Sequence, residues 1–436
     1  MPKSAIEILS APVERVVRVS LLPNGLRIVT DQVPHVMSAA VGLWIDAGSR
    51  YETADENGMS HLLEHMLFKG TARRSARALA EEIEAVGGHL NAWTSRDHTS
   101  FHARVLAEDV PLAVDLLADM LLNSRFDPDE LDREREVILQ EIGQAEDTPD
   151  DIVFDHLQDA AFPEQPLGRP ILGTAERIRA FRREDLFSYL GRNYRAGNTV
   201  LAAAGRVDHD ALVALCAEAF AGLPEGGAAG FERAGYRGRA RHDRRPTEQL
   251  HLTLGFPGVA FDDRDYYAAQ VFSTMLGGGM SSRLFQEVRE NRGLAYSVYS
   301  FTGSHADTGL FGIYAGTTPA LASDMLKVIA DETLKLAEPV EEAEVARARA
   351  QLKVGLLMSL ESSSARIEQI GRQMLIFGRP LSLAEMVDAV DEVDAGRVAA
   401  LCRRLLTEGR PAVATVGPKA TRLPDHDGIR ALFQLS

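Results

Sequence analysis

LPEGGAAGFERAGYRGRARHDRRP, residues 223–246, divides the chain of 436 residues nearly in half. The stretch is rich in Gly and Arg and has no apolar periodicity, which is typical of a linker with solvated basic side chains. A chain of this length exceeds the size of one ordinary hydrophobic core. We therefore predict two domains, residues 1–222 and residues 247–436, joined by this linker.

The two halves resemble each other when they are compared at a fixed offset. At an offset of 210 residues (168 to 378), Gly-Arg-Pro at 168–170 coincides with Gly-Arg-Pro at 378–380, and Asp97 coincides with Asp307. Both halves also follow the same expected order of strand, helix, strand, long helices and strand. Self-similarity at a fixed spacing is the signature of a structural repeat, so we predict that the chain contains one.

Residues 61–71, HLLEHMLFKGT, carry polar side chains within an otherwise apolar run. The apolar residues of this run are typical of a helix packed against a core. His61, Glu64 and His65 occupy positions i, i+3 and i+4, so a helix would present all three on one face. Buried polar groups need partners, and this face is therefore either exposed or occupied by a ligand.

Two neutral imidazoles at this spacing can hold a divalent ion such as Zn²⁺. The adjacent glutamate can then take a proton from water whose pKa the metal lowers, and the order H-x-x-E-H is the inverzincin signature. At the offset of 210 residues (168 to 378), His61 coincides with Val271 and His65 coincides with Met275. The repeat thus predicts that only the first half retains this chemistry.

A catalytic zinc site commonly has a third protein ligand, and residues 127–146, DPDELDREREVILQEIGQAE, offer candidates. Asp127 as N-cap and Pro128 at the first helical position predict a helix. Glu134 and Glu141 stand seven residues apart and therefore share one face of it. Either this face meets the metal and its histidines, or Glu134 pairs with a surface arginine.

Four stretches together resemble the pitrilysin and insulin-degrading-enzyme family of zinc peptidases, and most of all its mitochondrial-processing-peptidase-type branch. They are HLLEHMLFKGT (61–71), GGHLNAWTSRDHTSF (87–101), EREVILQE (134–141) and PLGRPILGT (166–174). The resemblance covers nearly the whole chain. It implies an α+β fold of two repeated halves, each an antiparallel sheet backed by helices.

The resemblance also implies roles for individual residues. His61, His65 and Glu141 are the expected ligands of one Zn²⁺ per chain, and Glu64 is the expected general base. Glu134 matches an acidic residue that the family places behind the ligands, seven positions before the third of them.

Substrate contacts are expected near these residues. The stretch HLNAW (89–93) resembles the edge strand along which substrates of the family lie extended, with Asn91 and Ala92 offering backbone contacts. Adding a strand recognises a peptide main chain without regard to its sequence. Phe68 matches a residue that lines a substrate pocket, and core packing is an equal alternative for it.

In the second half, Arg289 and Tyr296 within LFQEVRENRGLAYSVYS (284–300) resemble the family's Arg/Tyr pair. That pair reaches toward the zinc site and helps to hold the substrate and the developing oxyanion. Both side chains can donate to a carbonyl oxygen that gains charge. The alternative is a helix-end arginine and a strand tyrosine packed in a core.

Three more histidines, His89, His98 and His102, lie close to Asn91 in the sequence. Alternation along a strand would put His98 and His102 on one face and His89 on the other. We therefore expect structural or surface histidines here rather than a second metal site.

The implied activity is that of a metal-dependent endopeptidase that hydrolyses unfolded or short peptides inside a closed chamber, by attack of water that Glu64 activates. Known members of the family enclose the chamber with four such domains, so a chain with two should pair with another chain. Because this chain holds both the zinc motif and the Arg/Tyr pair, we expect a homodimer. The pair that faces each zinc would then come from the partner chain.

Two alternatives stay open: one subunit of a heterodimer with a metal-free homologue, and a non-catalytic binding or assembly subunit. Other classes are disfavoured. A net charge of −16 argues against nucleic-acid binding, and no apolar run reaches the roughly 18 residues that a membrane span needs. The N-terminal residues 1–17 lack the features of a secretory signal, so we expect a cytoplasmic protein.

Overall fold

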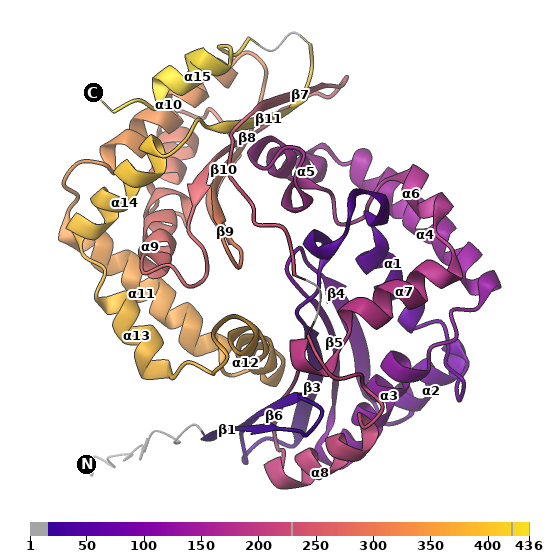
Figure 1. Ribbon diagram of the computed structural model, residues 1–436. Helices are drawn as coiled ribbons and strands as arrows, with labels where there is room; N and C mark the ends of the chain where they lie inside the picture. Colours follow the sequence, from indigo (N-terminus) through magenta and orange to yellow (C-terminus); the bar gives the residue numbers. More distant parts are fainter. Residues whose placement is uncertain (1–15, 228–229, 420–421, 436) are drawn as a thin grey trace, which may run out of the picture.

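The computed structural model describes residues 16–227, 230–419 and 422–435. Residues 1–15, which include most of the stretch assessed for a secretory signal, lie outside the described residues. The chain forms two halves, each built on one sheet, and the two halves lie opposite each other (Figure 1). None of the described helices combines the length and the apolarity that crossing a membrane requires.

The first sheet has six strands in the order β1-β2-β6-β3-β5-β4. Neighbouring strands are antiparallel except for the parallel pair β2 and β6. β4 is therefore an edge strand. The strands are β1 (Val16–Leu21), β2 (Arg27–Gln32), β3 (Ser38–Ile45), β4 (His89–Thr94), β5 (Thr99–Leu106) and β6 (Thr199–Gly205).

The second sheet has five strands in the order β7-β11-β8-β10-β9, again with one parallel pair, β7 and β11. The strands are β7 (Ala240–Arg244), β8 (Leu250–Gly258), β9 (Ser297–Ser304), β10 (Gly309–Thr317) and β11 (Ala412–Gly417). The composition of residues 223–246 indicated an irregular linker. β7 lies inside this stretch, so part of it is a regular strand. Its charged side chains are those of an edge strand, where solvent accommodates them.

Helices back both sheets. In the first half they are α1 (Met59–Leu67), α2 (Ala76–Ala85), α3 (Val110–Asn123), α4 (Pro128–Glu146), α5 (Pro149–Ala161), α6 (Ala175–Ala180), α7 (Arg183–Asn193) and α8 (His209–Ala219). In the second half they are α9 (Tyr266–Gly277), α10 (Ala322–Lys335), α11 (Glu342–Ser359), α12 (Ser363–Phe377), α13 (Leu383–Asp391), α14 (Ala395–Thr407) and α15 (His426–Leu432). The predicted fold class is confirmed.

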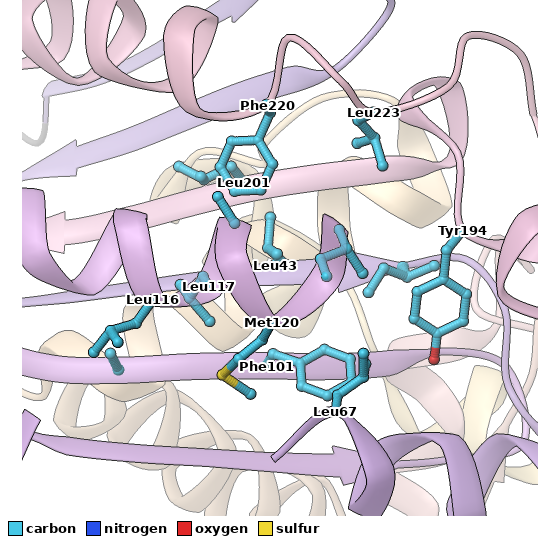
Figure 2. Close-up of a cluster of buried hydrophobic side chains, with 14 of the residues drawn as sticks. Leu43, Leu67, Phe101, Leu116, Leu117, Met120, Tyr194, Leu201, Phe220 and Leu223 are labelled. Atoms are coloured by element: carbon cyan, nitrogen blue, oxygen red, sulfur yellow. The ribbon is translucent and has the colours of Figure 1, made fainter. Parts of the chain in front are cut away.

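The main core of the first half lies between its sheet and the helices α1 and α3 (Figure 2). Leu43 of β3, Phe101 of β5, Leu67 of α1 and Met120 of α3 all belong to this buried cluster. Burying each such side chain contributes about 1.5–3 kcal/mol. This packing fixes α1, the helix with the two histidines, on the sheet.

The predicted repeat is confirmed in three dimensions. α9 takes the place of α1, and α11 takes the place of α4, and each pair of helices is in contact. Val271 and Met275, which stand where the first half has His61 and His65, are buried in the apolar core of the second half. The second half thus has apolar core residues where the first half has the two histidines.

The halves also exchange helices. α5 of the first half packs on β8 and β11, and its equivalent α12 of the second half packs on β2, β3 and β6 (Figure 1). Gly371 of α12 lies so close to Trp44 of β3 that an added Cβ would come within 2.5 Å of the indole. Each sheet therefore has one face covered by the other half.

A buried arginine joins the two halves where the repeats meet. Arg50, in the short helix η1 (Ser49–Tyr51), lies 2.9 Å from a carboxylate oxygen of Asp97 and 2.8 Å from one of Asp307. These are the two aspartates that coincide in the repeat. Phe231 of the connecting stretch stacks on the guanidinium, 3.9 Å from its carbon to the ring centroid.

His305 completes the junction with a contact of 2.6 Å to Asp97. Burial disfavours ionisation of Asp97, but His305 and Arg50 more than offset this effect and hold the pKa of Asp97 below its usual range. The junction is therefore a charged cluster whose members depend on one another.

We expect Arg50→Ala to lower the free energy of unfolding by roughly 3–5 kcal/mol, because the largely enclosed carboxylates of Asp97 and Asp307 lose the cation that they share. Urea unfolding of the metal-free protein measures this loss. Arg77→Ala is the matched control, since the Arg77 side chain is 85% exposed and pairs with Glu81; it should cost less than about 1 kcal/mol. Equal losses in the two variants would contradict a special role for Arg50.

Candidate active site

A buried carboxylate fixes the N-terminus of α1. Glu52, which is 2% exposed, accepts hydrogen bonds from the backbone N–H groups of Gly58 and Ser60, at 2.9 and 2.7 Å. Burial raises the pKa of Glu52 to about 7, although these hydrogen bonds oppose the rise. A carboxylate at this end also accepts hydrogen bonds from N–H groups that have no partner within the helix. The first turn of α1, which contains His61, is therefore fixed.

α1 and α4 bring three candidate ligands together. Nε2 of His61 and Nε2 of His65 each lie 3.8 Å from Oε2 of Glu141. Suitable ligand atoms of the three residues all lie within 4.8 Å of one another. Within the described part of the chain, no other group of His, Cys, Asp and Glu converges in this way.

The spacing and the chemistry of these atoms fit a metal ion. A distance of 3.8 Å is too long for a hydrogen bond, whereas ligands of a tetrahedral zinc, with bonds of about 2.0–2.1 Å, lie roughly 3.4 Å apart. Oε2 of Glu141 and Nδ1 of His61 are buried and have no hydrogen-bond partner among the described residues. A divalent ion would satisfy the orphaned carboxylate oxygen.

The protonation state of His61 suits a metal ligand. Burial lowers the pKa of His61 to about 4, and the neighbouring His65 contributes in the same direction. The imidazole is therefore neutral near pH 7, which is the form that binds a metal.

Glu64 lies on the same helix face, one position before His65. Its carboxylate accepts a hydrogen bond from the hydroxyl of Thr94, at the end of β4, with 2.5 Å between the oxygens. Burial raises the pKa of Glu64; Thr94 and His65 lower it in part, and Glu141 raises it further. The net rise suits a group that accepts and returns a proton near neutral pH.

Glu134 does not pair with a surface arginine. It is buried on α4 and lies between two partners: Oε2 is 3.0 Å from Nδ1 of His65, and Oε1 is 2.7 Å from Nζ of Lys69. Burial alone would raise the pKa of Glu134, but the contacts with His65 and Lys69 outweigh it and lower the pKa. A carboxylate on Nδ1 leaves Nε2 of the imidazole directed at a metal.

The predicted substrate strand is β4, the edge of the first sheet. Asn91 is exposed, and its side-chain oxygen lies 2.8 Å from the backbone N of its neighbour Ala92. β4 also contacts α1. An open sheet edge therefore runs beside the helix that carries the histidines.

The position of Phe68 favours core packing. It caps the C-terminus of α1, is half-buried and packs on the first core, with its ring centroid 6.3 Å from that of Phe101.

Arg289 and Tyr296 lie together but not at the group of three candidate ligands, His61, His65 and Glu141, called the metal-ligand cluster below. Arg289 belongs to the short helix η6 (Phe285–Asn291), and its guanidinium carbon lies 4.4 Å from the ring centroid of Tyr296. Tyr296 is 76% exposed, so it is not a packed core residue. Among the described residues, no hydrogen bond, ion pair or ring contact joins this pair to the histidines or to Glu141.

The other three histidines do not form a metal cluster within the described part of the chain. His98 is buried against Trp93, with ring centroids 4.7 Å apart, and burial lowers its pKa to about 4. It is a packed, neutral side chain.

Sequence reasoning gave no role to three residues that support the site: Glu52, Lys69 and Thr94. Lys69 and Thr94 act through contacts with residues distant in the sequence, and Glu52 acts through backbone groups six and eight residues further on; none of the three belongs to a periodic pattern. Thr94 carries the weakest signal, since a threonine in a strand is ordinary. Lys69 lies within the quoted motif, where its nearness to the histidines was the available clue.

Two family models match the chain: insulinase (peptidase family M16) over residues 27–175, and the peptidase M16 inactive domain over residues 180–352. An uncharacterized zinc protease of Streptomyces coelicolor is 43% identical over 427 residues, covering 95% of this chain and 92% of the relative. A probable mitochondrial-processing peptidase subunit beta of Arabidopsis thaliana is 42% identical over 440 residues, covering 97% and 82% respectively.

Solved structures with the same fold include a peptidase M16 inactive domain from Pseudomonas fluorescens. It has a TM-score of 0.86 at 24% identity and covers 94% of this chain and 99% of that chain. A protease from Helicobacter pylori has a TM-score of 0.85 at 20% identity and covers 93% and 100%. At these identities the likeness shows the fold alone.

We expect Glu134→Gln to weaken zinc binding by about 10–100-fold, because an amide cannot hold both His65 and Lys69 as the carboxylate does. Competition with a chromogenic chelator measures the dissociation constant. Glu136→Gln changes an exposed residue of the same helix and should leave the constant unchanged. Unchanged zinc affinity in Glu134→Gln would show that Glu134 does not support the site.

Proposed function

The chain belongs to peptidase family M16, and we propose that it is a zinc-dependent endopeptidase that hydrolyses unfolded or short peptides. The observation that carries this proposal is the convergence of His61, His65 and Glu141 around an unsatisfied carboxylate oxygen, with Glu64 on the same helix face. One Zn²⁺ per chain would be held by these three side chains. When bound, it supplies a Lewis acid that lowers the pKa of water and polarises the peptide carbonyl.

Glu64 is the proposed general base. Its carboxylate takes a proton from the attacking water and returns it to the leaving amine, so that no covalent enzyme intermediate forms. The hydrogen bond from Thr94 orients the carboxylate. The raised pKa of Glu64 places this group closer to neutrality, where both directions of proton transfer are efficient.

β4 is the proposed substrate strand. An extended peptide would add to this open edge, with Asn91 and Ala92 providing backbone contacts. Recognition of the main chain by strand addition suits a peptidase of broad sequence preference, and it requires an unfolded substrate. Contact between β4 and α1 supports this placement, since the added strand would run past Glu64.

Arg289 and Tyr296 are proposed to hold the substrate and the developing oxyanion of a site in a second copy of the chain. Their mutual contact and the exposure of Tyr296 support this role, because a partner could reach them. The proposed assembly is a homodimer whose two chains enclose a chamber. We retain the expectation of a cytoplasmic protein that binds neither nucleic acid nor membranes.

Glu64→Gln should lower cleavage of a quenched fluorescent peptide by about 10²–10⁴-fold, because the amide cannot accept the proton. Metal analysis should find the same zinc content in both proteins, since Glu64 is not a proposed ligand. Glu81→Gln, at a side chain that is 58% exposed, is the matched control. Full activity in Glu64→Gln would refute the proposed base.

Mixing two inactive variants tests the homodimer. After exchange of subunits, Glu64→Gln and Tyr296→Phe chains should recover about a quarter of wild-type activity, because half of the random dimers then contain one complete site. Each variant alone stays inactive. No recovery, with exchange verified by mass spectrometry of labelled chains, would place the pair in its own chain's site or require a different partner.

A further inference from the structure

Lys69 makes a contact that links the end of α1 to the metal-ligand cluster. Its Nζ lies 2.7 Å from Oε1 of Glu134, whose other oxygen lies 3.0 Å from Nδ1 of His65. The Glu134 side chain is 6% exposed and that of Lys69 is 29% exposed. The order of contacts is thus ammonium, carboxylate, imidazole, and Nε2 at the far side of that imidazole faces Glu141.

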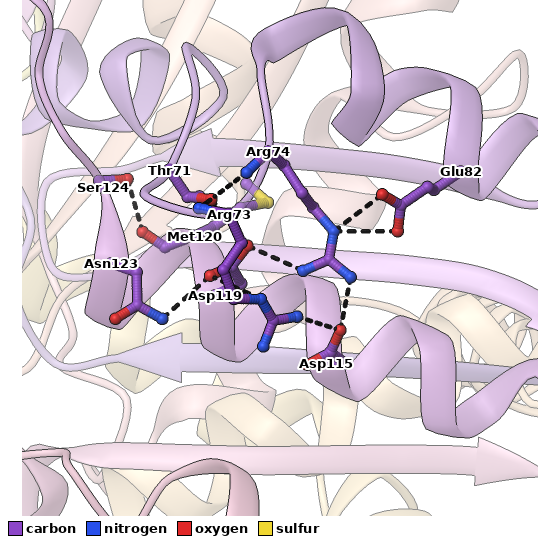
Figure 3. A network of polar contacts seen from close by, with 9 residues as sticks. All are labelled: Thr71, Arg73, Arg74, Glu82, Asp115, Asp119, Met120, Asn123 and Ser124. Carbon is purple, nitrogen blue, oxygen red and sulfur yellow. Dashed lines mark hydrogen bonds and ion pairs between the residues drawn. The ribbon is translucent and has the colours of Figure 1, made fainter.

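The backbone around Lys69 is held on both sides. Its N–H donates to the carbonyl of Met66, in the last turn of α1, over 3.2 Å. Two residues later, the hydroxyl of Thr71 donates to the buried carboxylate of Asp119 on α3, over 2.8 Å (Figure 3). The backbone that carries the Lys69 side chain is therefore held in place by contacts before and after it.

Arginines reinforce this anchor. Arg74 lies 2.8 Å from Asp119 and 2.6 Å from Asp115, and Thr71 accepts hydrogen bonds from the backbone N–H groups of Arg73 and Arg74 (Figure 3). Asp119 has no exposed side-chain surface. This network is distant from the histidines and stabilises the segment that follows α1, and Lys69 lies two residues before its first member, Thr71.

We propose that Lys69 is a positioning residue of the zinc site, acting through Glu134 on His65; this inference rests on the zinc-dependent function proposed above. The ammonium holds one oxygen of Glu134, which leaves the other free to receive Nδ1–H of His65. The imidazole is then fixed in the tautomer and rotation that present Nε2 to the metal.

The balance of charges around the two histidines explains why a cation lies beside Glu134. Three carboxylates, those of Glu64, Glu134 and Glu141, surround the two histidines. Zn²⁺ and one ammonium balance these three negative charges, whereas Zn²⁺ alone does not. A buried carboxylate without its cation is costly, and loss of Lys69 would let Glu134 turn away from His65 toward water.

The competing explanation is an ordinary ion pair that only stabilises the fold. An ion pair of that kind would stabilise the folded chain without changing its affinity for a metal. The two explanations differ in what they predict for zinc affinity and in whether the effect of Lys69 requires Glu134.

The test compares the zinc dissociation constants of Lys69→Met, Lys69→Arg and Lys327→Met, measured by chelator competition. Lys69→Met should weaken zinc binding about 3–10-fold, less than loss of Glu134 itself. Lys69→Arg keeps the cation and should stay within about twofold of the wild type. Lys327→Met is the matched control, since Lys327 is 60% exposed and pairs with Asp324 three residues away; it should bind zinc as the wild type does.

A double-mutant cycle with Glu134→Gln identifies the route of the effect. If Lys69 acts through Glu134, Lys69→Met should cause no further loss of affinity in the Glu134→Gln background. Wild-type affinity in Lys69→Met, or an equal loss in both backgrounds, would overturn the inference. If the wild type itself bound no zinc, the proposed function would fail instead, so the two failures are distinguishable.

Discussion

The buried guanidinium of Arg50 is the contact on which the arrangement of the two halves depends. It lies between Asp97 and Asp307, the aspartates that occupy equivalent positions in the repeat, and the connecting stretch passes over it at Phe231. Removing one member of such a cluster leaves a buried charge without compensation. The exchange of α5 and α12 buries further apolar surface between the halves.

This junction lies close in sequence to the candidate active site. Two residues after Arg50, Glu52 accepts hydrogen bonds from the backbone N–H groups at the start of α1. This helix carries His61, Glu64 and His65. The helix is thus fixed at its start by the region where the halves meet and, beyond its end, by the Thr71–Asp119 anchor. Precise placement of ligands needs rigid support of this kind.

Much of this could be predicted from local patterns. The spacing of His61 and His65 predicts that they share a helix face, and the spacing of Glu134 and Glu141 predicts the same for α4. That Glu141 meets the two histidines followed only from the resemblance to the family, because periodicity does not fix which two helices face each other. The repeat was detectable, but not the meeting of its two aspartates on one arginine, since that contact joins residues 47 and 257 positions apart (50 to 97 and 50 to 307). β7 was not predicted, because a charged edge strand resembles a linker in its composition. The role of Lys69 depends on a contact across the fold that no spacing predicts.

The central claim is that His61, His65 and Glu141 hold one zinc ion beside Glu64. Anomalous diffraction from crystals of the zinc-loaded protein, collected on both sides of the zinc absorption edge, tests it most directly. The account predicts one peak per chain, about 2.0–2.2 Å from Nε2 of each histidine and from a carboxylate oxygen of Glu141. A peak at other residues, or no peak at this cluster in zinc-saturated crystals, would contradict it.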